Sequence, residues 1–185
     1  MTTWIVLGLI VLVGLYVIYL YNSLVKKRQM VREGWSGIDV QLQRRSDLIP
    51  NLVETVKGYA THERAALEAV TEMRARAAGV DRDDVAGRAQ AEDMLTRALG
   101  KLFAVAEAYP DLKASDNFRE LQGSLEEIEH ALQMSRRYYN GAVRGLNVMV
   151  ESFPSNLVAG QFGFRQAEYF EIEDPEARAV PQVSF

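Results

Sequence analysis

The feature that most constrains this chain is an uncharged apolar run near its N-terminus, from Trp4 to Tyr21. A helix over this run would be roughly 27 Å long, which is close to the thickness of a hydrocarbon core of about 30 Å. Aromatic side chains stand near both ends, Trp4 at one end and Tyr19 and Tyr21 at the other, as is common at membrane interfaces. The sequence therefore predicts a transmembrane anchor over residues 1–25.

A cleaved signal peptide is the alternative interpretation of the same run. Signal peptides begin with basic residues, have a shorter apolar core and end at a small-residue cleavage site. This run begins Met-Thr-Thr and is followed by YNSLVKKR. These features favour an anchor that stays attached.

The charges beside the anchor predict its orientation. No Lys or Arg precedes it, whereas Lys26, Lys27 and Arg28 follow it directly. The positive-inside tendency then places the short N-terminus outside and the rest of the chain in the cytoplasm. The same cations could contact anionic headgroups, but setting the topology is the simpler interpretation.

Beyond the anchor, apolar residues recur at alternating spacings of three and four, which is typical of amphipathic, coiled-coil-like helices. The first stripe consists of Val31, Trp35, Ile38, Leu42, Arg45, Ile49, Leu52, Val56, Tyr59, Glu63, Ala66, Val70 and Met73. The second consists of Ala91, Leu95, Ala98, Leu102, Val105 and Tyr109. The third consists of Phe118, Leu121, Leu125, Ile128, Leu132, Ser135, Tyr139, Ala142, Leu146, Met149 and Phe153. Such helices bury their stripes on one another, so we predict an all-α bundle of three to four helices.

Breaks in the pattern predict the connections. Residues 79–84 read as a turn and residues 111–117 as a loop. Pro50 interrupts the first stripe and, with Asp47 as a possible N-cap, indicates a break or a sharp kink, although the unbroken register favours one kinked helix. After Pro154, the apolar residues up to Phe164 predict a short capping segment. We divide the chain into the anchor, a helical domain over 26–164, and an acidic, disordered tail over 165–185.

The composition excludes several kinds of chemistry. The chain has no cysteine, two histidines and a net charge of −4, so thiolate chemistry and general nucleic-acid binding are not expected. No nucleophile or phosphate-binding motif is present. Glu127 and His130 form a single Glu-x-x-His pair, whereas di-iron bundles need two. We expect no catalytic residues, no metal site and no cofactor.

Polar and glycine residues within the stripes are candidates for helix packing. Arg45 and Glu63 occupy seam positions, where a charged residue can pair with another helix and fix the register. Glycine inside a helix costs about 1 kcal/mol relative to alanine, so glycines there need a packing reason. The candidates for close helix contact are Gly34, Trp35, Gly37, Tyr139, Gly141 and Gly145. Contact within the chain is favoured over contact with a partner's helix.

Several long segments resemble the LemA family of bacterial membrane proteins. They include GWSGIDVQLQRRSDLIPNLVETVKGYATHE, LQGSLEEIEHALQMSRRYYNGAV and ESFPSNLVAGQFGF. The resemblance implies an N-terminal anchor in the bacterial inner membrane and a compact, up-and-down antiparallel four-helix bundle, and it favours a helix boundary at Pro50. Gly34 stands where alanine is commoner in the family.

The family has no agreed activity, so the resemblance provides no catalytic residues. It implies scaffold or adaptor work at the cell envelope, since some members resemble parts of magnetosome membranes. The partners it suggests are the lipid bilayer, other membrane proteins such as a membrane metalloprotease or a TPM-domain protein, or a second copy of the chain. The alternatives are an organiser of anionic membrane surfaces and, less favoured, a metal-dependent enzyme.

Overall fold

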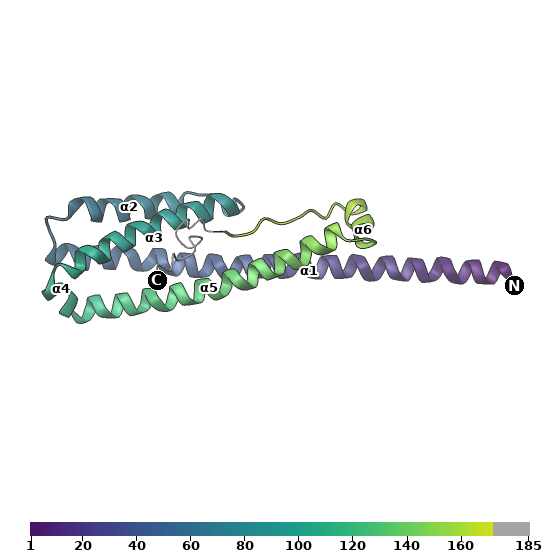
Figure 1. Cartoon of the computed structure of the whole chain (residues 1–185), viewed down its shortest axis with the longest axis horizontal. Helices are drawn as coiled ribbons and strands as arrows, with labels where there is room; N and C mark the ends of the chain where they lie inside the picture. The colour runs from purple at the N-terminus through teal and green to yellow at the C-terminus, as the bar shows by residue number, and fades with distance from the viewer. Residues whose placement is uncertain (172–185) are drawn as a thin grey trace, which may run out of the picture. The chain divides into compact units, whose positions relative to one another are not determined.

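The structure is a computed structural model that describes residues 1–171. Every regular element in this part of the chain is a helix, which confirms the all-α prediction (Figure 1). The helices are α1 (Thr2–Tyr59), α2 (Arg64–Ala78), α3 (Val85–Glu107), α4 (Pro110–Ala114), α5 (Asp116–Glu151) and α6 (Ser155–Gln161).

The described chain forms two compact units. Among the described residues, the first consists of residues 1–40 and 131–169, and the second of residues 41–130 with residues 170–171. Helices α1 and α5 contribute residues to both units.

The first part of α1 has the properties of a membrane-spanning helix. Its most apolar window has a mean hydropathy of 2.5, and only 6% of that window is buried. Trp4, Ile10 and Tyr19 are all exposed. The prediction of a long apolar helix at the N-terminus is therefore confirmed.

The helix boundary expected at Pro50 is wrong, because α1 continues through this residue to Tyr59. Proline cannot donate to the carbonyl four residues earlier, which here belongs to Ser46. The Arg74 Nε–H of α2 donates to that carbonyl at 2.8 Å instead. Pro50 itself is exposed, so its ring meets solvent rather than a neighbouring helix. These two conditions account for an unbroken helix at a proline.

The turn predicted between α2 and α3 is present, whereas the loop predicted after α3 is partly helical. The turn predicted over 79–84 lies between α2 and α3, and Asp84 caps α3 by accepting a hydrogen bond from the Gly87 amide at 2.8 Å. The loop predicted over 111–117 instead contains most of α4. Pro110 and Asp111 occupy the first turn of α4, where a fixed φ and an acidic side chain favour helix initiation.

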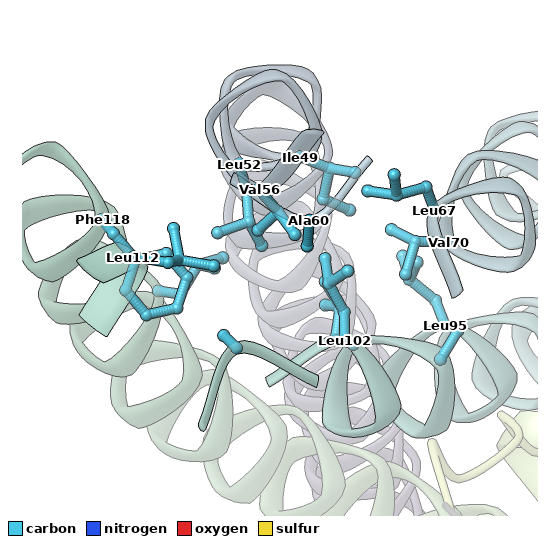
Figure 2. Close-up of a cluster of buried hydrophobic side chains, with 14 of the residues drawn as sticks. Ile49, Leu52, Val56, Ala60, Leu67, Val70, Leu95, Leu102, Leu112 and Phe118 are labelled. Carbon is cyan, nitrogen blue, oxygen red and sulfur yellow. The ribbon is translucent and has the colours of Figure 1, made fainter. Parts of the chain in front are cut away.

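The second unit has a hydrophobic core to which α1, α2, α3, α4 and α5 all contribute (Figure 2). Its labelled members are Ile49, Leu52, Val56, Ala60, Leu67, Val70, Leu95, Leu102, Leu112 and Phe118. Most of these residues belong to the predicted stripes. Tyr59 departs from its stripe and is exposed, because α1 ends there and the chain turns towards α2.

The first unit has its own smaller core, formed by α1, α5, α6 and the residues that follow α6. Its buried members are Leu20, Leu24, Leu146, Val158, Ala159 and Phe164. Residues 165–171 have no regular secondary structure. The remainder of the predicted acidic tail lies outside the described residues.

Candidate functional site

Of the charged residues that the structure describes in the second unit, Arg45 is the most deeply buried, and its side chain is fully buried. Its Nη2 donates to the Glu92 carboxylate at 2.7 Å and to the Glu92 carbonyl at 3.0 Å. Its Nη1 donates to the Thr96 hydroxyl at 3.1 Å and forms an ion pair with Glu129. A seam residue of α1 thus contacts one carboxylate on α3 and another on α5.

The electrostatics of this cluster depend on Arg45. Burial raises the pKa of the Glu92 carboxyl above its ordinary value of 4.5, while the adjacent Arg45 acts in the opposite direction. Removal of Arg45 would therefore leave a buried carboxyl that favours its protonated form. A planar guanidinium with two carboxylates also fits only one relative position of the three helices, which is how a buried polar residue can specify register.

Glu63, the second polar seam residue, and the charged residues near Pro50 lie at or close to the surface. Glu63 directly precedes α2, and its carboxylate accepts a hydrogen bond from the Tyr109 hydroxyl at 3.3 Å. Lys57 and Glu54 form an exposed pair at 3.8 Å. Exposed pairs of this kind contribute little to stability.

In the first unit, α1 and α5 approach each other closely at Gly34. A Cβ at this position would lie 2.9 Å from the Tyr139 Cα and 3.1 Å from the Tyr138 ring. The indole ring of Trp35 packs beside this contact, with its centroid 5.5 Å from that of Tyr139. A side chain larger than hydrogen at position 34 would have to move a helix backbone.

The remaining candidate glycines differ from Gly34. A Cβ on Gly145 would lie 3.3 Å from the Lys27 Nζ, which is the mobile end of a long side chain, and a Cβ on Gly37 would lie 3.8 Å from the Ser135 hydroxyl. A Cβ on Gly141 would have nothing within 4 Å. Of these four glycines, only Gly34 lies so close to the backbone of another helix that a side chain would not fit.

Hydrogen bonds from α5 hold the segment that follows α6. The Tyr139 hydroxyl donates to the Glu168 carbonyl at 2.8 Å, and burial, with a smaller effect of the Glu168 charge, raises the pKa of Tyr139 to about 12. The Asn147 side chain donates to the Ala167 carbonyl at 3.0 Å and accepts from the Ala167 amide at 2.8 Å. The first residues of the predicted tail are therefore attached to α5.

The predicted membrane-interface residues divide into two groups. Trp4, Tyr19, Tyr21 and Lys26 are exposed. Lys27 and Arg28 are half-buried, and the Arg28 guanidinium lies 4.8 Å from the centroid of the Phe164 ring. Part of the positive charge beside the anchor therefore contacts protein.

Glu127 and His130, the residues of the single Glu-x-x-His pair, are both exposed on α5. Within residues 1–171, no three His, Cys, Asp or Glu side chains come together in a group that could hold a metal ion.

A surface groove of about 820 Å³ lies between α1 and α2 in the second unit. Its apolar strip includes Val53, Leu67 and Ala75, and charges of both signs border it. The bordering charged residues are Lys57, Arg64, Glu68 and Glu72.

The partners of Arg45 and the role of Arg74 were not predicted from the sequence. A usable signal existed for the partners, since Glu92 and Glu129 each directly follow a stripe residue, Ala91 and Ile128. Charged residues at the edge of a stripe can reach a cation in a facing seam. For Arg74, the signal was an interior proline that leaves a carbonyl free.

Comparison with known proteins places the chain in a family. The model of the LemA family matches residues 34–185. Magnetosome protein MamQ 1 and MamQ 2 of Paramagnetospirillum magneticum are each 26% identical over 175 residues, covering 82% of this chain and 64% of theirs. Protein LemA of Metamycoplasma hominis is 23% identical over 155 residues, covering 84% of this chain and 70% of its own.

This chain spans about 64% of the length of the MamQ relatives. None of these names is that of an enzyme. The family model covers most of the sequence, from the close contact at Gly34 through the helices that hold the Arg45 cluster. The chain belongs to the LemA family.

Proposed function

We propose that this protein is a membrane-anchored helical scaffold that binds other membrane proteins through its helix faces and performs no catalytic step. The observation that carries the proposal is the exposed, uncharged first part of α1. A helix this apolar and this poorly covered is stable only in lipid or against another protein.

In the proposed arrangement, residues 1–25 span the bacterial inner membrane with the N-terminus outside. Lys26 and the cations after it support a cytoplasmic position for the rest of the chain. Residues 41–59 of α1, α2, α3 and the first part of α5 form the up-and-down four-helix bundle, because all four supply residues to one core. Helix α6 is the capping element of the α1–α5 pair in the first unit.

The groove between α1 and α2 is the proposed contact surface, and its occupant is an amphipathic helix of another membrane protein. An apolar strip bordered by charges of both signs matches the apolar face and polar edges of such a helix. The relatives named as magnetosome proteins support a role in an assembly. Further candidates for the partner are a membrane metalloprotease, a TPM-domain protein or a second copy of the chain.

Two matched variants of the full-length protein test the groove. Ala75→Arg places a long side chain in the groove, whereas Ala104→Arg places the same side chain on an exposed position of α3. Proteins cross-linked in intact cells are purified with each variant and quantified by mass spectrometry. We expect Ala75→Arg to lose a stoichiometric neighbour that wild type and Ala104→Arg retain. Equal recovery with both variants would contradict groove binding.

The orientation has an independent test, because the chain has no native cysteine. A single cysteine at the exposed position Met134 should be labelled by a membrane-impermeant maleimide only after the cells are opened. Labelling in intact cells would place the helical domain outside and overturn the proposed topology. Binding that depended instead on anionic lipid and fell with salt would favour the surface-organiser alternative.

A further inference from the structure

The third apolar stripe does not end in the protein interior. Its last member, Phe153, is 79% exposed, although the stripe residues before it on α5 are buried or half-buried. Leu157 and Phe162, which follow it in the chain, are also exposed, at 64% and 53%. We call these three residues the α6 face. An exposed group of large apolar side chains needs an explanation, because a soluble surface gains nothing from it.

Helix α6 has two distinct sides. Val158 and Ala159 are buried in the core of the first unit with Leu20 and Leu24 of α1. Leu157 points away from that core, since it is exposed next to the buried Val158. The side that packs therefore fixes α6 on α1 and leaves the α6 face uncovered in residues 1–171.

The position of α6 along α1 is informative. The Phe162 ring contacts the ring of Tyr21, with 4.9 Å between centroids, and Phe164 contacts the same ring at 5.7 Å. Tyr21 is the last residue of the apolar run that begins at Trp4, and the first charged residue after it is Lys26. Figure 1 shows α6 beside α1. Through Phe162, the α6 face thus meets the end of the anchor, where a spanning helix leaves the hydrocarbon.

The sequence around α6 is compatible with a lipid interface. No charged residue lies between Glu151 and Arg165. Phe153 lies just before α6, Leu157 within it and Phe162 just after it. Exposed aromatic and aliphatic side chains without a charge to desolvate are suited to the boundary between headgroups and acyl chains. The Arg28 side chain packs on Phe164 and keeps its cation beside the protein.

We propose that the α6 face is a second membrane contact, in which Phe153, Leu157 and Phe162 insert into the lipid interface beside the anchor. This contact makes α6 an interfacial helix that holds the first unit against the bilayer at two points. The inference rests on the proposed membrane anchoring by α1. It commits to lipid as the occupant, because the face adjoins the apolar surface of the anchor itself.

Single cysteines in the full-length, cysteine-free protein provide the test. Leu157→Cys and Phe162→Cys are labelled with an environment-sensitive fluorophore and reconstituted in vesicles of phosphatidylcholine and phosphatidylglycerol. Nitroxide lipids with the quencher near the headgroup or near the bilayer centre then report depth. Met134→Cys is the matched control, since this α5 residue of the first unit is 52% exposed. Ile10→Cys reports on the anchor.

We expect headgroup-proximal quenchers to reduce the Leu157→Cys and Phe162→Cys signals to about half, as for interfacial helices, and to leave the Met134→Cys signal unchanged. Central quenchers should act on the Ile10→Cys label. A quenched label at position 10 with unquenched labels at 157 and 162 would overturn the α6 contact alone, whereas an unquenched label at position 10 would overturn the anchoring on which it rests. Disulfide-linked dimers of the Leu157→Cys variant, without lipid quenching, would assign the face to a second copy and also overturn the proposal.

Discussion

The two units join α1 to α5 by different means. In the first unit the contact depends on shape. Gly34 has no side chain, so the backbone of Tyr139 occupies the space that a Cβ at position 34 would need. In the second unit the contact is one of charge, because Arg45 binds Glu129 on α5 together with Glu92 on α3. A shape contact sets the distance between helices, whereas a buried ion network sets their register. A larger side chain at Gly34 should therefore disrupt the shape contact, and loss of the Arg45 charge should disrupt the ion network.

The largest effect is expected from breaking the charge contact. Arg45→Leu should lower the free energy of unfolding by about 3–5 kcal/mol, because it removes the main cation beside the buried Glu92 carboxyl and the ion-pair partner of Glu129. Urea unfolding of the full-length protein in lipid nanodiscs, followed by circular dichroism, measures this loss. Arg44→Leu is the matched control, and a change within about 0.5 kcal/mol is expected at this exposed neighbour.

The pH dependence of Arg45→Leu separates charge from packing. Burial already raises the pKa of Glu92, and loss of Arg45 removes the main effect that lowers it. A raised carboxyl pKa gives stability that is present at low pH and is lost as the pH rises through the pKa of the folded state. The deficit of Arg45→Leu should therefore shrink from about pH 7 to about pH 4. An equal deficit at both values would mean that lost packing, not a stranded carboxylate, causes it.

The shape contact is broken by one methyl group. Gly34→Ala should cost about 1–2 kcal/mol, because the clash with Tyr139 outweighs the better helix propensity of alanine. Gly141→Ala, where a Cβ meets nothing within 4 Å, should instead stabilise the protein by about 0.5–1 kcal/mol. The same unfolding measurement gives both values. Effects of the same sign in the two variants would remove the argument for a close approach at Gly34.

A smaller effect is expected at Arg74, which supports α1 beside Pro50. Arg74→Met should cost about 1 kcal/mol, because the Ser46 carbonyl loses its donor. In a Pro50→Ala background the helix supplies its own amide to Ser46, so the cost of Arg74→Met should largely vanish. Unfolding of the two single variants and the double variant measures this coupling, and additive effects would contradict it.

The apolar pattern was sufficient to predict the helices and most of the core. Residues such as Ile49, Leu102 and Leu132 lie on stripes and are buried, because spacings of three and four follow the geometry of any α-helix. At Pro50 the unbroken register favoured one helix and the family resemblance favoured a boundary, and only the structure shows the donor, Arg74 on another helix, that lets α1 continue. A local rule about proline cannot include a partner that only the tertiary structure brings near.

The candidate packing residues show the same division. Arg45 was identified because it is a charged residue at an otherwise apolar seam position. Which carboxylates pair with it depends on how α3 and α5 align with α1. Gly34 and Gly141 have equal status in the sequence, yet only Gly34 lies against a backbone. The exposed end of the third stripe, at Phe153, likewise became visible only with the structure. In each case the type of residue was predictable and its neighbour was not.

The weakest of these contacts lies in the first unit, where Tyr139 has a hydrogen bond in addition to its packing on Gly34. Tyr139→Phe keeps the ring and removes the hydrogen bond to the Glu168 carbonyl, so we expect a loss of about 0.5–1 kcal/mol at neutral pH. Tyr59→Phe, at an exposed position, is the control and should change little.

The alkaline behaviour of Tyr139→Phe distinguishes this hydrogen bond from a packing change. The pKa of Tyr139 is raised from its ordinary value of 10.0 to about 12, so its contribution to stability is complete below pH 10 and is lost as the pH rises towards 12. The unfolded chain ionises first, which favours unfolding of the wild type in this window. Unfolding curves across it should therefore fall more steeply for wild type than for Tyr139→Phe, and the two should converge. If they stayed parallel, the Tyr139 hydroxyl would titrate as in the unfolded chain, which would contradict its burial between α5 and the segment after α6.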